Sequence, residues 1–109
     1  MKLVRIAPLP DDAIATAAAF YAEWVERLPA SKDLLLIFPP ADHTHRAWRL
    51  AAVQSLARQL VPLRVNAVAS DDEAAIAEAA AYLAAAPGLT GQYLPLDGTG
   101  AGAVIGSAQ

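Results

Sequence analysis

A run of five apolar residues, Leu34 to Phe38, constrains the fold of this 109-residue chain more than any other segment. No polar residue interrupts the run, so a strand formed from it projects apolar side chains to both faces of a sheet. Strands of this kind belong to parallel sheets in which both faces are covered. Pro39 and Pro40 follow directly and end the strand.

Extended and helical patterns alternate along the rest of the chain. Further strands are expected at 2–9, 63–69 and 92–96, and helical spacing of apolar residues at 12–28, at 44–60 and from 73 to about 86. This β-α-β-α-β-α-β order predicts an α/β fold, a partial Rossmann-like open parallel sheet of about four strands with three helices. Pro95 removes a backbone donor from the last strand, which predicts that this strand lies at a sheet edge.

Each helical pattern begins at residues that can accept hydrogen bonds from free backbone N–H groups. The expected caps are Asp11 or Asp12 for the first helix, Asp42 or Thr44 for the second, and Ser70 with Glu73, in the S-x-x-E spacing of a capping box, for the third. Pro29 ends the first helix, and the dipeptide at 87–88 ends the third.

The composition excludes several classes of function. Apolar residues make up 56% of the chain, charged residues 17% and cysteine none. The absence of cysteine excludes disulfides, thiolate nucleophiles and cysteine-type zinc sites, and it fits a cytoplasmic location. The net charge of −3, with no basic cluster, argues against nucleic acid as a partner. No uninterrupted apolar stretch is long enough for a membrane span.

The positions of the glycines argue against a dinucleotide site. Such a site needs glycines where the first strand meets the first helix, so that backbone N–H groups can approach a pyrophosphate. The first glycine of this chain is Gly88, and the junction at 7–12 carries two prolines and two aspartates instead. The glycine-rich segment at 98–106 is followed by only three residues, so we expect a domain at 1–98 and a flexible tail at 99–109.

Three segments of the second half form an ordered series. They are A-A-V-Q-S-L-A-R-Q-L at 51–60, R-V-N-A-V-A at 64–69, and A-Y-L at 81–83 followed by T-G-Q at 90–92 and D-G at 97–98. From about Arg46 onward the chain therefore resembles the C-terminal half of the short-chain dehydrogenase/reductase family. The resemblance implies a truncated Rossmann-like domain, because that family has a seven-stranded sheet whose first strands carry the glycine-rich cofactor loop.

The family's catalytic residues have no counterparts here. Counting back from Leu60, the position of its tyrosine falls on Asp42 and that of its lysine on Arg46, while F-P-P at 38–40 stands where its serine would be. The P-G that borders the nicotinamide in the family is S-D at 70–71. An aspartate is ionised at neutral pH and is a poor proton donor. The sequence thus predicts no catalytic, cofactor-binding or metal-binding residue and no cofactor.

Asp42, His43 and His45 leave an alternative open. Two imidazoles and a carboxylate within four residues could serve a small NAD(P)-binding or oxidoreductase-like protein with a non-standard site. However, rings at i and i+2 of a helix point apart, so a solvated loop with a helix cap is the favoured interpretation. The helix arginines at 46, 49 and 58 are expected on a solvated or interfacial face.

The incomplete sheet predicts self-association. Right-handed crossovers in sequential strand order would place all three helices on one face, and even with one helix on the opposite face that face would be thinly covered. The first strand would also be an unpaired edge. Because the family commonly dimerises through the helices that match 12–28 and 44–60, we expect a homodimer there, with Tyr21, Trp24 and Trp48 at the contact, or an association with a full-length dehydrogenase.

Overall fold

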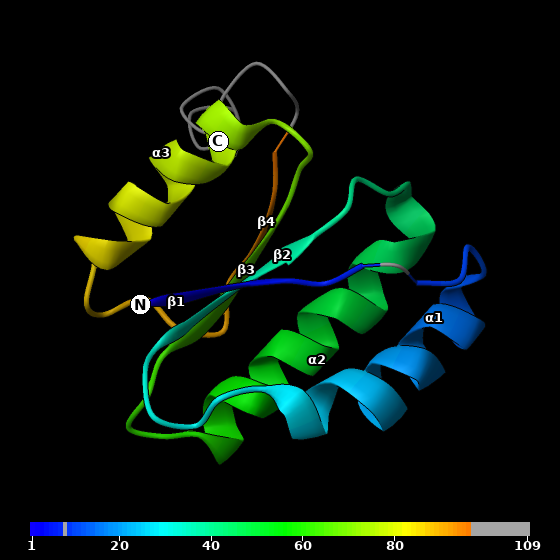
Figure 1. The fold of residues 1–109 in the computed structure, drawn as a ribbon, viewed down its shortest axis with the longest axis horizontal. Coiled ribbons are helices and arrows are strands. Elements are labelled where there is room, and N and C mark those ends of the chain that lie inside the picture. Colours follow the sequence, from blue (N-terminus) through cyan, green and yellow to red (C-terminus); the bar gives the residue numbers. More distant parts are fainter. Residues whose placement is uncertain (8, 97–109) are drawn as a thin grey trace.

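The computed structural model describes residues 1–7 and 9–96 and contains a parallel sheet with strand order β1-β2-β3-β4 (Figure 1). The strands are β1 (Lys2–Arg5), β2 (Leu34–Phe38), β3 (Val65–Ala69) and β4 (Tyr93–Pro95). The predicted partial Rossmann-like α/β sheet is confirmed, and β4, which contains Pro95, lies at an edge as expected. The proposed tail at 99–109 falls outside the described residues.

Each connection between successive strands is helical. α1 (Ala13–Ala19) continues through a π-helical turn (Phe20–Trp24) and a 3₁₀ turn (Val25–Arg27), α2 (Arg46–Gln59) follows a 3₁₀ turn (His43–His45), and α3 spans Glu73–Ala84. The first helical segment stops because Leu28 is extended, as steric contact with the ring of Pro29 requires. In the part of the chain that the structure describes, no helix has both the length and the apolar character needed to cross a membrane.

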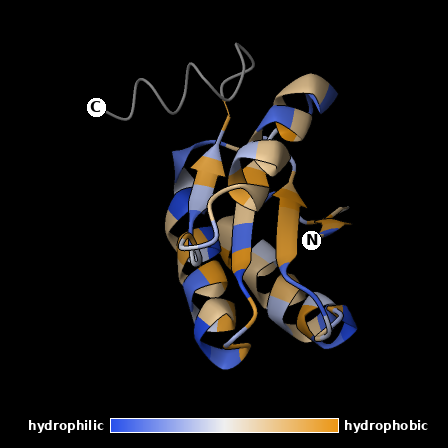
Figure 2. Ribbon diagram, turned by 90° about the vertical axis from the view of Figure 1, so that its left-hand side faces the viewer, coloured by the Kyte–Doolittle hydropathy of each residue, from blue (hydrophilic) through white to orange (hydrophobic). Residues whose placement is uncertain are grey.

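The side chains of β2 alternate between two cores. Leu34, Leu36 and Phe38 pack beneath α1 and α2, whereas Leu35 and Ile37 point to the other face of the sheet. All five are buried. In Figure 2 one strand is coloured as hydrophobic along its whole length, and the helices alternate between hydrophobic and hydrophilic bands. The five-residue apolar run therefore forms a strand that is buried on both faces, as its sequence predicts.

α3 covers the face of the sheet opposite to α1 and α2 (Figure 1). Its buried residues, with the strand residues that they meet, are Ala75, Ile76, Ala79 and Leu83 against Leu35, Ile37 and Val68. Right-handed crossovers alone would have placed α3 with the other two helices, but it lies on the opposite face, which is the alternative arrangement considered from the sequence. Since the strand order is sequential, its connection has the opposite hand to the first two. The physical reason is the second apolar face of β2 and β3, which would otherwise remain in water.

Arg64 connects three elements at the amino end of the sheet. Its Nε donates to Oδ2 of Asp33 over 2.9 Å, and its Nη1 donates to the carbonyl oxygens of Leu83 and Ala86 over 3.0 and 2.8 Å. The Arg64 backbone N–H also donates to Asp33. The two bonds from Arg64 to Asp33 hold the pKa of the Asp33 carboxyl below its ordinary value, and the backbone bond has the larger effect. The arginine of the R-V-N segment therefore holds the C-terminal end of α3 against the start of β2.

Asn66 holds the loop that leads into β4. It is 2% exposed, its Nδ2 donates to the carbonyl oxygen of Leu89, and its Oδ1 accepts from the backbone N–H of Gln92, both over 3.0 Å. Gly91 has a φ of 73°, a conformation that favours glycine, and its N–H donates to the carbonyl oxygen of Val65. The R-V-N and T-G-Q segments therefore bond to each other and set the register of β3 and β4.

Candidate functional site

Parallel α/β sheets bind ligands beyond the carboxyl ends of their strands, where the connecting helices also begin. In this protein an aspartate caps each of those helical starts. Asp12 accepts from the N–H of Ala15, Asp42 from that of Thr44, and Asp72 from those of Ala74 and Ala75. At each start one or two of the backbone donors that could hold a phosphate are therefore bonded to a carboxylate, which also repels anions.

The start of α3 differs from the expected capping box. Asp72, not Ser70, is the N-cap, and the Ser70 hydroxyl accepts from the N–H of Asp72 over 2.9 Å. Glu73 forms a two-pronged ion pair with Arg5 at 2.7 and 3.0 Å instead of turning back on the helix. The capping-box prediction is wrong because the carboxylate of Asp72 satisfies two helix donors by itself and leaves Glu73 free to reach β1.

A cavity of about 490 Å³ opens beside the carboxyl ends of β1 and β2, a size that suits a small organic molecule. Its lining comes from the β1–α1 loop, from α1, from the β2–α2 loop and from α2. The lining residues are Ala7, Leu9, Pro10, Asp11, Thr16, Pro39, Pro40, Ala41, Asp42, His45 and Arg49.

Two of the three candidate residues from the sequence line this cavity, and the third does not. Asp42 and His45 are in the lining, whereas His43 is exposed on the 3₁₀ turn. Asp42 accepts from both the hydroxyl and the backbone N–H of Thr44, and these bonds hold the pKa of its carboxyl below the ordinary range. Within residues 1–7 and 9–96, no three potential metal ligands gather at one point.

His45 is a buried side chain with a fixed partner. It is 8% exposed, and its Nδ1 lies 3.2 Å from the indole Nε1 of Trp48. An indole N–H can only donate, so Nδ1 accepts and the proton of the neutral ring lies on Nε2. The imidazole therefore has a hydrogen-bond donor left for another partner.

Arg49 is the residue that the sequence analysis placed wrongly. The helix arginines were expected on a solvated or interfacial face, but Arg49 is only 2% exposed, packs in the core and lines the cavity, while Arg46 and Arg58 are exposed. Its guanidinium carbon lies 4.7 Å from the ring centre of Phe38. Position 49 is one helical turn from buried His45 and from buried Val53, and this spacing is the signal that could have revealed its burial.

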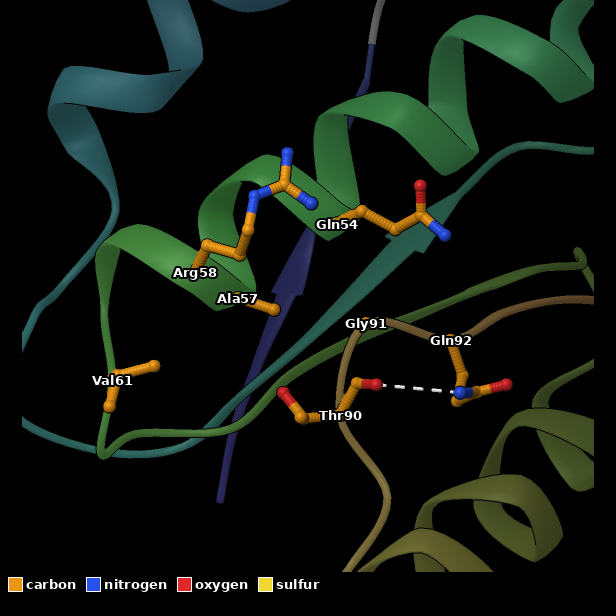
Figure 3. Close-up of a pocket in the computed structure, with 7 residues that line it drawn as sticks. All are labelled: Gln54, Ala57, Arg58, Val61, Thr90, Gly91 and Gln92. Atoms are coloured by element: carbon orange, nitrogen blue, oxygen red, sulfur yellow. Dashed lines mark hydrogen bonds between the residues drawn. The ribbon is translucent and has the colours of Figure 1, made fainter.

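A second cavity, of about 370 Å³, lies between α2 and the loop before β4 (Figure 3). Gln54 and Arg58 of α2 flank it on one side, with Thr90 and Gln92 on the other (Figure 3). The hydroxyl of Thr90 accepts from the N–H of Val65, and the Gln92 side chain donates back to the carbonyl of Thr90. These polar groups are used in joining β3 to β4, so we place the candidate site at the first cavity.

A protein-family model described as short chain dehydrogenase-like protein matches residues 4–96, which is most of the chain. The chain belongs to this SDR-like family. Neither the curated proteins nor the solved structures that were searched contain a match. In this SDR-like protein the residues shared with the wider dehydrogenase pattern, Arg64, Asn66 and the T-G-Q segment, have structural roles.

Proposed function

We propose that this SDR-like protein does not carry out hydride transfer and acts through self-association. The observation that supports the first part is the aspartate at each helical start on the carboxyl edge. A dinucleotide needs backbone donors at such an edge for its pyrophosphate. Here one or two donors at each helical start are bonded to an aspartate, and the capping groups carry the same sign of charge as the ligand.

The residues at the family's catalytic positions support the same proposal. Asp42 stands at the tyrosine position, and its lowered pKa keeps it ionised at neutral pH, so it lacks the proton that a carbonyl reduction must receive. Arg46, at the lysine position, is exposed. Neither residue can take over the tyrosine–lysine chemistry.

Two surfaces on the outer side of α1 and α2 support self-association. Ile14 is 82% exposed and Tyr21 is 47% exposed, about two helical turns apart along one segment. On α2, Ala47 and Ala51 are exposed small residues beside half-buried Leu50, so another helix can approach closely. We therefore propose a homodimer in which these two helices pack against their copies.

The aromatic residues expected at the contact have different positions. Trp48 packs on the rings of Phe20 and Phe38 at 5.7 and 5.6 Å, and Trp24 lies partly buried against the same core. Tyr21 is the exposed one of the three expected contact residues. We therefore centre the proposed interface on Ile14, Tyr21 and Ala51.

Calorimetric titration with NADH and NADPH tests the absence of a cofactor site. We expect no measurable heat of binding at millimolar dinucleotide. Binding with a dissociation constant below about 0.1 mM would contradict the proposal, because that affinity requires specific contacts to the phosphates.

Sedimentation at micromolar concentration tests the homodimer. We expect a dimer for the natural chain and a monomer for Ala51→Arg, which places a long charged side chain in the proposed contact. Ala81→Arg is the matched control, because Ala81 is also an exposed helical alanine but lies on α3. A natural chain that sediments as a monomer would refute self-association, and mixing with a full-length dehydrogenase would then test the other expected partner.

A second candidate function is favoured by the burial of His45 in the same cavity as Asp42. It is the small oxidoreductase-like or NAD(P)-binding protein expected from Asp42, His43 and His45, with its non-standard site at Asp42 and His45 because His43 lies outside the cavity. Calorimetric titration with NADH and NADPH separates the two functions. Dinucleotide binding that is lost in His45→Ala and kept in His43→Ala would favour the second function.

A further inference from the structure

Arg49 is a buried cation that forms no direct ion pair within the described part of the chain. In the described residues, carboxylates pair with Arg5 and Arg64 but not with Arg49. A buried charge that lacks a partner lowers stability, and proteins keep such groups mainly where a ligand or a mechanism uses them. Arg49 is one of the residues that line the cavity beside β2, so a ligand there can supply a negative charge close to it.

The hydrogen bonds of Arg49 leave one edge of its guanidinium unused. Nη1 donates to the carbonyl oxygen of Pro39 over 2.9 Å and to the hydroxyl of Tyr93 over 3.1 Å. Nε is shut off from solvent and has no acceptor, and no group within 1–7 and 9–96 accepts from Nη2. The N–H groups of Nε and Nη2 lie parallel in any arginine, and this fork matches the two oxygens of a carboxylate.

The rest of the lining limits the charge and the shape of the ligand. Asp11 and Asp42 also face the cavity, and their charges repel a dianion more strongly than a monoanion. Proline, alanine and leucine side chains from both loops make up most of the remaining wall. A ligand that fits has one negative charge and a short apolar body.

We propose that this cavity binds a small aliphatic monocarboxylate, with its carboxylate on the Nε and Nη2 edge of Arg49 and its chain against the proline-lined loops. Because Nε is shut off from solvent in this structure, the proposal includes a small displacement of the loop at 39–42 that opens Nε to the carboxylate. His45, through the proton on Nε2, is a second donor in the lining. This inference does not depend on the proposed self-association or on the absence of hydride transfer.

Nitrogen–proton NMR of the two indole groups tests the proposal on the full chain, because the Trp48 indole N–H bonds to His45 in the cavity lining. Titration with hexanoate is expected to shift the Trp48 indole signal and leave that of Trp24 in place. Hexanamide, which has the same shape without the charge, and inorganic phosphate are expected to bind at least about tenfold more weakly.

Two arginine variants on the same helix locate the charge. Arg49→Met is expected to weaken hexanoate binding at least about tenfold, and Arg58→Met, which removes an exposed arginine, is expected to leave it unchanged. An unmoved Trp48 signal in millimolar hexanoate, equal binding of hexanamide, or stronger binding of phosphate would each overturn the proposal. These three results are measured on the natural chain, so they test the proposal even if Arg49→Met does not fold.

Discussion

Arg64 and Asp33 meet at the amino end of the sheet, with Nε of the arginine 2.9 Å from Oδ2 of the aspartate. The same guanidinium bonds to two carbonyl oxygens at the end of α3. Asp33 immediately precedes β2 and Arg64 precedes β3. One side chain therefore ties two strands to the helix that covers the second face of the sheet.

Replacing Arg64 by methionine should lower the free energy of unfolding by about 2–4 kcal/mol, because it leaves two helix carbonyls without their donor and leaves the partly buried carboxylate of Asp33 with only the backbone N–H of residue 64. Urea denaturation followed by circular dichroism measures the loss. Arg64→Lys keeps the charge but not the two-pronged guanidinium. Its free energy of unfolding should therefore lie between those of the natural chain and Arg64→Met. A loss below about 0.5 kcal/mol for Arg64→Met would show that water replaces these bonds.

The stability should depend on pH through Asp33. Its pKa lies below the ordinary value of 3.8 because the backbone N–H and then the side chain of Arg64 donate to it. A group with a lowered folded-state pKa contributes stability above its unfolded pKa and loses it as the pH falls through the folded pKa. The difference in unfolding free energy between the natural chain and Asp33→Asn should therefore be constant from pH 7 to about pH 5 and shrink below pH 4. A difference that grows on acidification would contradict this account.

Asn66 should be intolerant of a change in either of its hydrogen-bonding atoms. Asn66→Ala leaves the N–H of Gln92 and the carbonyl of Leu89 unpaired and should cost about 2–3 kcal/mol of unfolding free energy. Asn66→Asp keeps the acceptor but sets a buried carboxylate against the Leu89 carbonyl, so it should cost more than the alanine variant. Thermal unfolding of both variants tests the order, and equal melting temperatures for Asn66→Asp and the natural chain would refute it.

The cap of α3 gives a matched pair of variants. Asp72→Ala should lower the unfolding free energy by about 1 kcal/mol, since Asp72 holds two helix N–H groups. Glu73→Ala should lower it by less than about 0.5 kcal/mol, because the Arg5–Glu73 pair is well exposed to solvent. Chemical denaturation compares the two, and a larger loss for Glu73→Ala would restore the capping box that the sequence predicts.

The candidate site followed from the sequence only in part. Asp42 and His45 were singled out because their chemistry is visible in the sequence, and both line the cavity. Arg49 was missed because an arginine on a helix usually faces water. Its burial depends on the rings of Phe38 and Trp48, and on an acceptor from β4 that lies 44 residues away in the sequence.

The sequence by itself determined the order of the strands and helices and the parallel sheet, because the apolar run at 34–38 and the helical spacing of the other apolar residues are local patterns. Only the tertiary structure decided that α3 crosses to the opposite face, that Asp72 replaces Ser70 as its cap, and that Arg49 lies buried beside a cavity. Each of these depends on which distant side chains meet once the sheet is assembled. The helical spacing around position 49 indicates burial, but no local pattern names the partners, because Phe38 and Tyr93 reach Arg49 only when both the sheet and its covering helices are in place.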